Sequence, residues 1–321
     1  METFQKRPTL SLLVVLVLCI ISGVLVANIR VRANAEVERI CSNLSAKLTA
    51  AAFSFPQETF YAKAAYVYDF STKTRLYGKD ESLALPLASL TKLMTVRIAL
   101  KSDALDDFYT IAPGDLSADG FVGFVESDSY RIRDLIKAAL IASSNDAASM
   151  LARSTGLSQS AFLEQMDVEA KHLGLGSLAY ASVTGLDTAD LRATASGSAA
   201  DIAQLLYKDY EEYPDIFSLS AKEGDTIRAS SGRSIDLANT DLAASRLALL
   251  MASKTGYTTS AGGNLAVLWQ EPRGDILGGV VLGSTTEGRF SDMIALHDSA
   301  NIYLNEVHTM LGVCTQSRQL K

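Results

Sequence analysis

The sequence is poor in the residues that build metal sites and disulfide-rich folds. Its 321 residues include only 3 cysteines and 3 histidines, and the histidines show no H-E-x-x-H pattern. Cys19, Cys41 and Cys314 are too far apart for a metal cluster of familiar spacing and too few for a disulfide framework. The sequence therefore predicts no metal ion, and zinc-dependent hydrolysis is not expected.

Clustered positive charge is also lacking. The net charge is −7, the isoelectric point is about 5.1, and no run of Lys or Arg is longer than two. Phosphate binding needs a clustered basic surface, so nucleic acid is not expected as a partner. A hydrophobic fraction of 48% with 20% charged residues is typical of a globular protein with a sizeable core.

One long apolar run stands at the N-terminus. Thr9–Ile29 carries no charge and is long enough to cross a bilayer core of about 30 Å. Two basic residues precede it and two arginines follow it, so the charge bias across the run is weak. We expect residues 1–32 to form a cytoplasmic stub and a retained membrane anchor. A signal peptide cleaved near residues 33–35 and a buried helix of a soluble protein are the alternatives.

The rest of the chain divides into a polar, Ala-rich stalk over residues 33–60, a globular domain over 61–312 and a short tail over 313–321. Aromatic and β-branched residues around a polar turn predict a β-hairpin over Ala64–Tyr77. Periodicity predicts further helices and strands. The helices are expected over Ser89–Leu100, Asp134–Leu151, Ser160–Leu173, Asp201–Tyr210 and Phe290–Leu311, and the strands over Leu247–Ala252, Asn264–Gln270 and Ile276–Leu282.

Strands at both ends of this domain, with helices between them, predict an α/β (α+β) fold. The sheet would be assembled from the two ends of the domain, and an inserted helical lobe would complete it.

The first motif with chemical meaning is S-L-T-K at Ser89–Lys92, the only S-x-x-K in the chain. On a helix these two side chains lie on one face, one turn apart. A serine hydroxyl needs a base to remove its proton, and a partly buried lysine with a lowered pKa can be that base. The spacing also occurs by chance. Its setting, at the start of an apolar helix just after Pro86, favours the functional interpretation.

Two further motifs are weaker when taken alone. S-S-N at Ser143–Asn145 can relay a proton and bind a peptide backbone, or it can simply cap a helix. Its second copy, at Ser299 and Asn301, is interpreted as solvated helix surface. K-T-G at Lys254–Gly256 follows an apolar strand. It can bind a carboxylate beside a closely approaching backbone, or it can mark a strand that ends in a turn.

S-x-x-K, S-x-N and K-T-G in this order are the active-site set of penicillin-binding proteins and serine β-lactamases. The wider sequence around them closely resembles low-molecular-mass D-alanyl-D-alanine carboxypeptidases, from about Ala64 to Leu311. The resemblance implies a β-lactamase/transpeptidase-like fold with an antiparallel sheet and helices on both of its faces. The segments that carry it are Pro86–Thr95, Ser143–Ala148, His172–Leu175, Val183–Asp187 and Ser253–Gly262.

The resemblance also implies catalytic roles. Ser89 would attack the carbonyl between the two D-alanines, with Lys92 as its base. Ser143 would relay a proton to the departing D-alanine, and Asn145 and Lys254 would organise the surrounding hydrogen bonds.

Substrate binding is implied for four more residues. Thr255 would bind the terminal carboxylate, Gly256 would let the substrate backbone approach, and the N–H groups of Ser89 and Tyr257 would form the oxyanion hole. Arg289 matches the family's carboxylate-binding arginine, because a guanidinium binds a carboxylate through two parallel hydrogen bonds. A surface arginine at the start of a helix is the alternative.

The implied enzyme trims peptidoglycan stem peptides that end in D-Ala-D-Ala, binds β-lactams and needs no cofactor. It would face the extracytoplasmic side of the cytoplasmic membrane. The chain has S-S-N where the family commonly has S-G-N, and Ser144 is expected to affect loop shape more than chemistry. Many relatives carry a second β-rich domain and a C-terminal anchor, and the N-terminal segment is expected to replace that anchor here.

Three rival functions are open. A class A β-lactamase would need a glutamate that activates water, and the segment around Glu164 lacks the E-x-x-L-N pattern. A D,D-endopeptidase would use the same machinery as a carboxypeptidase. A silent muropeptide-binding module would be expected to lack the nucleophile or its lysine, and both are present here.

Overall fold

The structure is a computed structural model, which describes residues 22–29, 31–32, 35–36, 39, 60–102, 104–116 and 122–319. The chain divides into two compact units, one of residues Met1–Ser54 with Ile302–Lys321 and one of Phe55–Asn301. In the first unit, residues 22–29 are helical and exposed. None of the helices described is long and apolar enough to cross a membrane. Residues 33–34 of the alternative cleavage site and most of the predicted anchor and stalk lie outside the described residues.

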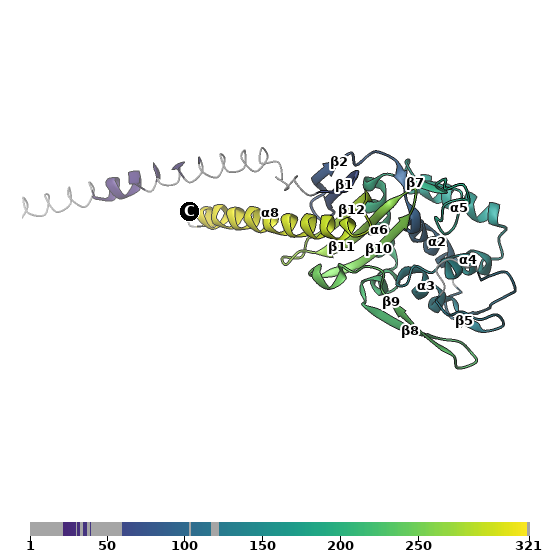
Figure 1. Ribbon diagram of the computed structural model, residues 1–321. Helices are drawn as coiled ribbons and strands as arrows, with labels where there is room; N and C mark the ends of the chain where they lie inside the picture. Colours follow the sequence, from purple (N-terminus) through teal and green to yellow (C-terminus); the bar gives the residue numbers. More distant parts are fainter. Residues whose placement is uncertain are drawn as a thin grey trace, which may run out of the picture. The chain divides into compact units, whose positions relative to one another are not determined.

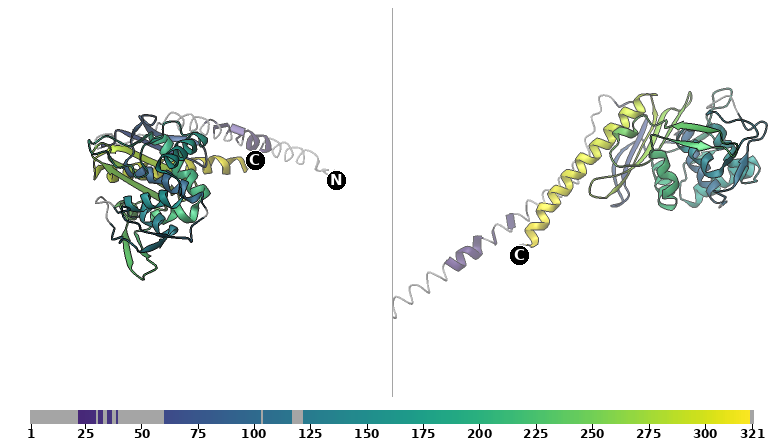
Figure 2. Two further views of the ribbon diagram at one scale, coloured as in Figure 1. Left: turned by 90° about the vertical axis from the view of Figure 1, so that its right-hand side faces the viewer. Right: turned by 90° about the horizontal axis from the view of Figure 1, so that it is seen from below.

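The second unit is built on a five-stranded antiparallel sheet in the order β10-β11-β12-β1-β2 (Figure 1). β1 pairs with β12 from Ala64 opposite Leu282 to Asp69 opposite Leu277. The views in Figure 2 show the same pairing, with the blue strands from early in the chain beside the yellow-green strands from its end. The prediction of a sheet assembled from both ends of the domain is confirmed. The strands are β1 (Ala64–Asp69), β2 (Thr74–Lys79), β10 (Leu250–Thr258), β11 (Gly262–Gln270) and β12 (Ile276–Ser284).

Helices cover both faces of this sheet. A side chain at Gly278 of β12 would collide with Phe70, whose ring stacks on Tyr207 of α6 (Ala199–Glu212) with centroids 4.0 Å apart. A side chain at the next residue, Gly279, would meet Met293 of α8 (Gly288–Gln319). Successive residues of a strand point to opposite faces, so α6 and the start of α8 pack on opposite faces of the sheet. The two glycines let both layers pack close to the strand.

The segment between the sheet's two parts forms a mostly helical lobe. One prediction here is wrong, because the stretch expected as a single helix over Asp134–Leu151 is two helices, α3 and α4. The chain leaves the helix at Ile141, passes through Ser143 with a positive φ of 56°, and starts again with Ser144 as N-cap. The lobe helices are α2 (Thr91–Leu100), α3 (Ile132–Leu140), α4 (Asn145–Ser154), α5 (Gln159–His172) and α7 (Pro214–Phe217).

Several short elements were not predicted. The most prominent is a hairpin, β8 (Gly224–Arg228) with β9 (Ser234–Ala238), which projects from the body in Figure 1. Two small sheets join β4 to β5, and β3 to β7 to β6. Their strands are too short to show a period. They are β3 (Leu85–Pro86), β4 (Phe108–Thr110), β5 (Ser129–Arg131), β6 (Ala179–Tyr180) and β7 (Ala195–Gly197), beside the 3₁₀ turns Ala88–Leu90, Ser218–Ala221 and Ala244–Arg246.

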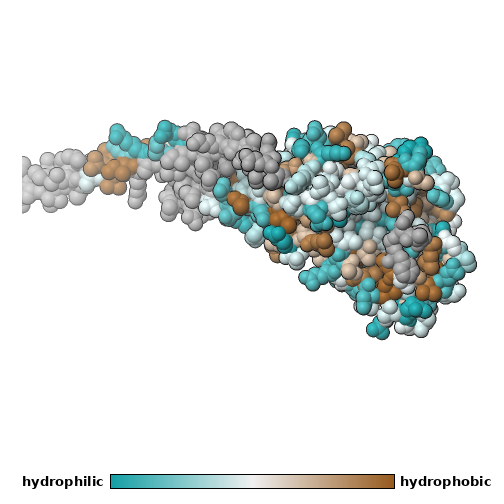
Figure 3. All heavy atoms as spheres, viewed as in Figure 1, coloured by the Kyte–Doolittle hydropathy of each residue, from teal (hydrophilic) through white to brown (hydrophobic). Residues whose placement is uncertain are grey.

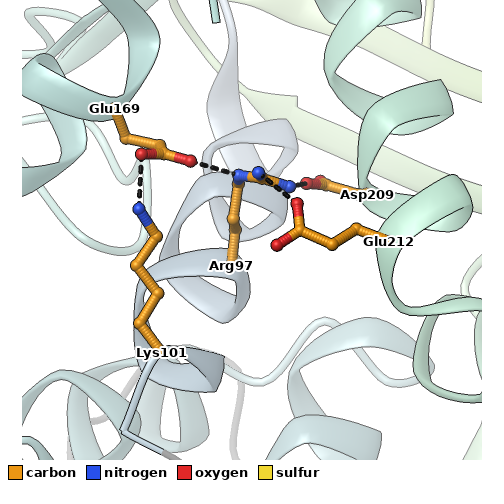
Figure 4. Close-up of polar contacts among 5 residues, drawn as sticks. All are labelled: Arg97, Lys101, Glu169, Asp209 and Glu212. Carbon is orange, nitrogen blue, oxygen red and sulfur yellow. Dashed lines mark hydrogen bonds and ion pairs between the residues drawn. The ribbon is translucent and has the colours of Figure 1, made fainter. Parts of the chain in front are cut away.

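A buried ion cluster joins three helices of the lobe (Figure 4). Arg97 of α2, whose side chain is 5% exposed, pairs with Glu169 of α5 at 2.7 Å. It also pairs with Asp209 of α6 at 3.1 Å and with Glu212 at 2.5 Å. Lys101 binds the second oxygen of Glu169. The cluster holds α2, the helix that carries Lys92, against α5 and α6.

On the face shown in Figure 3, apolar residues reach the surface among polar ones, while the main core lies inside.

Candidate active site

Ser89 lies on a short 3₁₀ turn, Ala88–Leu90, directly before α2. The turn begins in a strained conformation, because Ala88 has a φ of +49°. Asn264 of β11 fastens the preceding backbone by donating hydrogen bonds to the carbonyls of Pro86 at 2.9 Å and Leu87 at 3.1 Å. The hydroxyl of Thr91 donates to the carbonyl of Ala88 at 2.7 Å. These contacts hold the strained turn in place, and Ser89 is left partly exposed.

Lys92 is fully buried one turn after Ser89. Its Nζ lies 2.8 Å from Ser89 Oγ, 2.7 Å from Asn145 Oδ1 and 3.1 Å from the carbonyl oxygen of Thr184. Burial, and then the nearby charge of Lys254, lower the pKa of Lys92 well below its ordinary value. The amine is therefore in contact with the hydroxyl and is biased toward its neutral form.

The turn between α3 and α4 presents the S-S-N motif. Ser143 accepts a hydrogen bond from Lys254 Nζ at 2.9 Å, and Asn145 is the first residue of α4. The helix cap is Ser144, whose hydroxyl accepts from the N–H of Ala147 at 3.2 Å. Ser144 therefore caps the helix, while Ser143 contacts Lys254 and Asn145 contacts Lys92. The expectation that Ser144 shapes the loop agrees with this cap.

The K-T-G motif lies inside β10, which runs from Leu250 to Thr258 along the edge of the sheet. The predicted strand, Leu247–Ala252, ended too early, and the alternative of a turn at the motif is wrong. Lys254 is 1% exposed, and burial followed by the charge of Arg289 lowers its pKa to about 7, with Asp241 opposing the shift.

Gly256 lies against the nucleophile turn. A Cβ at this position would lie 2.8 Å from the carbonyl oxygen of Leu87 and 3.2 Å from the backbone nitrogen of Ser89. Only glycine lets β10 come this close. The next residue, Tyr257, has 53% of its surface exposed.

Arg289, at the start of α8, reaches the same strand. Its Nη1 donates to the carbonyl of Gly256 at 2.9 Å, and its guanidinium lies 4.6 Å from the ring centroid of Phe290. The residue is 9% exposed, so the alternative of a surface arginine is wrong. Within the described part of the chain, no carboxylate forms an ion pair with Lys92, Lys254 or Arg289. Lys254 and Arg289 favour an anionic ligand, whereas Lys92 is biased toward its neutral form.

All nine predicted site residues lie on segments that adjoin one another in space. These segments are the Ser89 turn with the start of α2, the Ser143 turn with the start of α4, β10 and the start of α8. The sequence motifs assign no part to Thr184, Thr240 or Asn264. Thr184 lies in V-T-G-L-D, one of the segments that carry the family resemblance, so the sequence contains a signal for it. Thr240 and Asn264 carry no local signal, because their contacts join positions far apart in the chain.

The second S-x-N copy behaves differently from its interpretation as solvated surface. Asn301 of α8 is partly buried and accepts a hydrogen bond from Trp269 Nε1 at 3.1 Å. It therefore fastens α8 to β11 and has no place in the candidate site.

Residues 50–286 match the family model described as D-alanyl-D-alanine carboxypeptidase. The chain belongs to this family. A D-alanyl-D-alanine endopeptidase of Pseudomonas aeruginosa is 30% identical over 211 residues, which are 64% of this chain and 66% of that protein. The carboxypeptidase DacF of Bacillus subtilis is 29% identical over 211 residues, covering 62% of this chain and 52% of that protein. The chain thus spans half to two thirds of the length of these two relatives.

Solved structures show the same fold. A putative penicillin-binding protein homologue of Mycobacterium tuberculosis aligns with a TM-score of 0.71 at 23% identity, over 78% of this chain and 94% of that one. Penicillin-binding protein D2 of Listeria monocytogenes, in its ampicillin-bound form, aligns with a TM-score of 0.66 at 26% identity, over 76% and 99%. The predicted penicillin-binding, transpeptidase-like fold is confirmed. Arg289 lies three residues beyond the family match, so its place in the site rests on the geometry.

Proposed function

We propose that this member of the family is a serine-type D-Ala-D-Ala carboxypeptidase that removes the terminal D-alanine of peptidoglycan stem peptides through an acyl-enzyme on Ser89. The observation that carries the proposal is the contact between Ser89 Oγ and the fully buried amine of Lys92 at 2.8 Å. A buried amine without a carboxylate partner tends to be neutral, and a neutral amine can accept the serine proton.

In the acylation step, Ser89 Oγ attacks the carbonyl carbon between the two D-alanines while Lys92 takes its proton. The C–N bond then breaks, and the leaving amine needs a proton. That proton is the one that Lys92 took from Ser89, and Ser143, whose hydroxyl contacts Lys254 at 2.9 Å, is proposed to relay it. D-Alanine leaves, and water hydrolyses the ester to restore the serine. The proton transfers use side chains alone.

The same geometry supports the binding roles. Lys254, Thr255 and Arg289 gather on and beside β10, where a free carboxylate would be attracted by the two cations. The N–H groups of Ser89 and Tyr257 are proposed as the oxyanion hole. Its support is the close approach of β10 to the Ser89 turn at Gly256.

The partners proposed are stem peptides ending in D-Ala-D-Ala and β-lactams. The Listeria relative was solved in an ampicillin-bound form, which supports the second. We further propose that residues 1–32 anchor the chain in the cytoplasmic membrane, that residues 33–60 form a stalk, and that the domain over 61–312 works on the outer side. The apolar run Thr9–Ile29 supports this arrangement.

A D,D-endopeptidase is the second candidate, because relatives from Pseudomonas aeruginosa and Escherichia coli carry that name. A β-lactamase is disfavoured by the position of Glu164, which is exposed on α5. The buried glutamate of that helix, Glu169, is held by Arg97 and Lys101. Digestion of crosslinked and uncrosslinked muropeptides separates the two peptidase activities.

The test is mass spectrometry of the full chain in detergent after incubation with benzylpenicillin, beside Ser89→Ala. We expect a penicilloyl adduct on the peptide that contains Ser89, absent in Ser89→Ala and lost over minutes or longer. Rapid penicillin hydrolysis without accumulated adduct would instead indicate a β-lactamase. A well-folded chain that leaves penicillin intact and carries no adduct would contradict the nucleophile assignment.

A further inference from the structure

Thr240 lies outside the three motifs, yet it contacts two of the segments that build the site. It lies two residues after β9, where the β8–β9 hairpin returns to the body. Its Oγ1 is 2.6 Å from Oγ1 of Thr255, the proposed carboxylate-binding hydroxyl. Its backbone N–H donates to the carbonyl of Ile141 at 3.1 Å, two residues before Ser143. Thr240 therefore links the Ser143 turn to β10.

The backbone around Thr240 is held firmly. The amide of Asn239 donates to the carbonyls of Ser220 and Lys222, each at 2.7 Å. The side-chain oxygen of Asn239 accepts from the N–H of Asp241 at 2.8 Å. A change in the Thr240 side chain thus leaves its Cα in place, and the hydroxyl is the group that such a change would test.

A bound carboxylate determines which of the two hydroxyls donates the hydrogen bond between them. The hydroxyl of Thr240 has two acceptors within reach, Thr255 Oγ1 at 2.6 Å and the carbonyl of Ile141 at 3.5 Å. Either hydroxyl can donate in the shorter contact. A carboxylate bound to Thr255 has only acceptor sites, so it accepts a hydrogen bond from the Thr255 hydroxyl, and Thr240 then donates to Thr255. A hydroxyl that already accepts a bond becomes a better donor.

We propose that Thr240 is a positioning residue that directs the Thr255 hydroxyl toward the substrate's free C-terminal carboxylate. It thereby helps the enzyme prefer substrates that end in a carboxylate. The inference rests on the proposed function. It adds Thr240 to the site, a residue that lies in the sequence between the S-S-N and K-T-G motifs and belongs to neither.

The test compares Thr240→Val, which keeps the shape and removes the hydroxyl, with Thr240→Ser, which keeps the hydroxyl. Thr226→Val is the matched control, because Thr226 lies in the same hairpin and its hydroxyl donates to the exposed Asp236 at 2.7 Å. Each full-length variant is assayed on an N-acylated D-Ala-D-Ala peptide and on the same peptide ending in a carboxamide. A neutral hydrogen bond of this kind contributes an effect of about three- to tenfold.

For Thr240→Val we expect KM for the carboxylate peptide to rise about three- to tenfold with kcat nearly unchanged, because the lost interaction acts equally on ground and transition states. The kcat/KM of the carboxamide peptide should stay at the wild-type value. Thr240→Ser and Thr226→Val should both behave as wild type. In a Thr255→Val background, Thr240→Val should add no further loss, because its effect passes through Thr255.

Other outcomes overturn the proposal. An equal loss on both peptides, or a loss that multiplies with that of Thr255→Val, would assign Thr240 a purely structural part. If Thr240→Val has wild-type kcat and KM on both peptides, Thr240 plays no part in substrate binding. If the wild-type chain reacts with neither peptide nor with benzylpenicillin, the proposed function itself fails and this inference falls with it. A reactive wild type with an unaffected Thr240→Val overturns the inference alone.

Discussion

Lys92 and Lys254 are both buried lysines without an ion-pair partner among the described residues, and each contacts a serine hydroxyl. Burial makes the charged form costly for both amines. The charges also repel, since Lys254 lowers the pKa of Lys92, and Arg289 lowers the pKa of Lys254. The arrangement favours one neutral amine beside Ser89, and it lets an incoming carboxylate stabilise the charge of the other.

This predicts how acylation depends on pH. With rising pH, kcat/KM should first increase as Lys92 loses its proton, at a pH well below the ordinary pKa of a lysine. It should then decrease as Lys254, with a pKa of about 7, loses the charge that attracts the carboxylate. Because the two lysines interact, the apparent pKa values of both limbs are properties of the pair and not of either residue alone. Stopped-flow acylation by benzylpenicillin between about pH 5 and 10 measures them.

Lys254→Arg is the control for the falling limb. A guanidinium keeps its charge throughout this range, so in an active variant the decrease should disappear. A wild-type profile that still rises above about pH 9 would contradict the assignment of the falling limb to Lys254.

At the scale of elements, the ion cluster in Figure 4 determines how α2 packs. Asp209 is fully buried, and burial raises its pKa well above the ordinary value even though Arg97 opposes the shift. The stabilising value of the cluster thus depends on Arg97 being present to compensate the carboxylates around it.

We expect Arg97→Ala to lower the free energy of unfolding by about 3 kcal/mol or more, because it leaves the buried Asp209 without a counter-charge and leaves Glu169 with Lys101 alone. Asp209→Asn should cost clearly less. It removes a charge that burial already disfavours, and the amide oxygen can still accept from Arg97. Urea unfolding at pH 7 compares the two variants, with the exposed Arg192→Ala as a surface control near zero. Equal losses for both core variants would show that the charge of Asp209 matters more than its burial suggests.

The elements also show where periodicity succeeds and fails. The helical pattern over Ser160–Leu173 closely predicts α5, because one face of that helix packs uniformly on the core. The pattern over Asp134–Leu151 hides the break between α3 and α4, because both helices bury the same kind of face. The break is decided by the left-handed turn at Ser143, whose partner Lys254 is distant in the chain, and by the local cap at Ser144.

For the whole domain, the central feature is the pairing of its first strand with its last. β1 lies between β2 and β12, and the register joins Ala64 to Leu282. Such a contact forms only when the chain between the two strands has been brought together, and its loop-closure cost is large. Local opening of one strand would expose the core on both sheet faces.

Native-state hydrogen exchange tests this cooperativity. The central amides of β1 and β12 should exchange at the same, highest protection of the domain, which corresponds to global unfolding. The β8–β9 hairpin, paired only with itself, should exchange at a lower free energy. Exchange of β1 before β12 would show that the two halves of the sheet unfold separately.

The sequence alone determined the proposed chemistry of this protein, because Ser89, Lys92 and the other motif residues are recognisable from local spacing and order. It also determined the fold class, since strands at both ends of the domain and helices between them permit few arrangements. Only the tertiary structure decided how the motifs meet. It placed K-T-G inside an edge strand against the Ser89 turn, turned Arg289 inward and brought Thr240 to Thr255. These contacts join residues that are distant in the chain, and no local pattern records them.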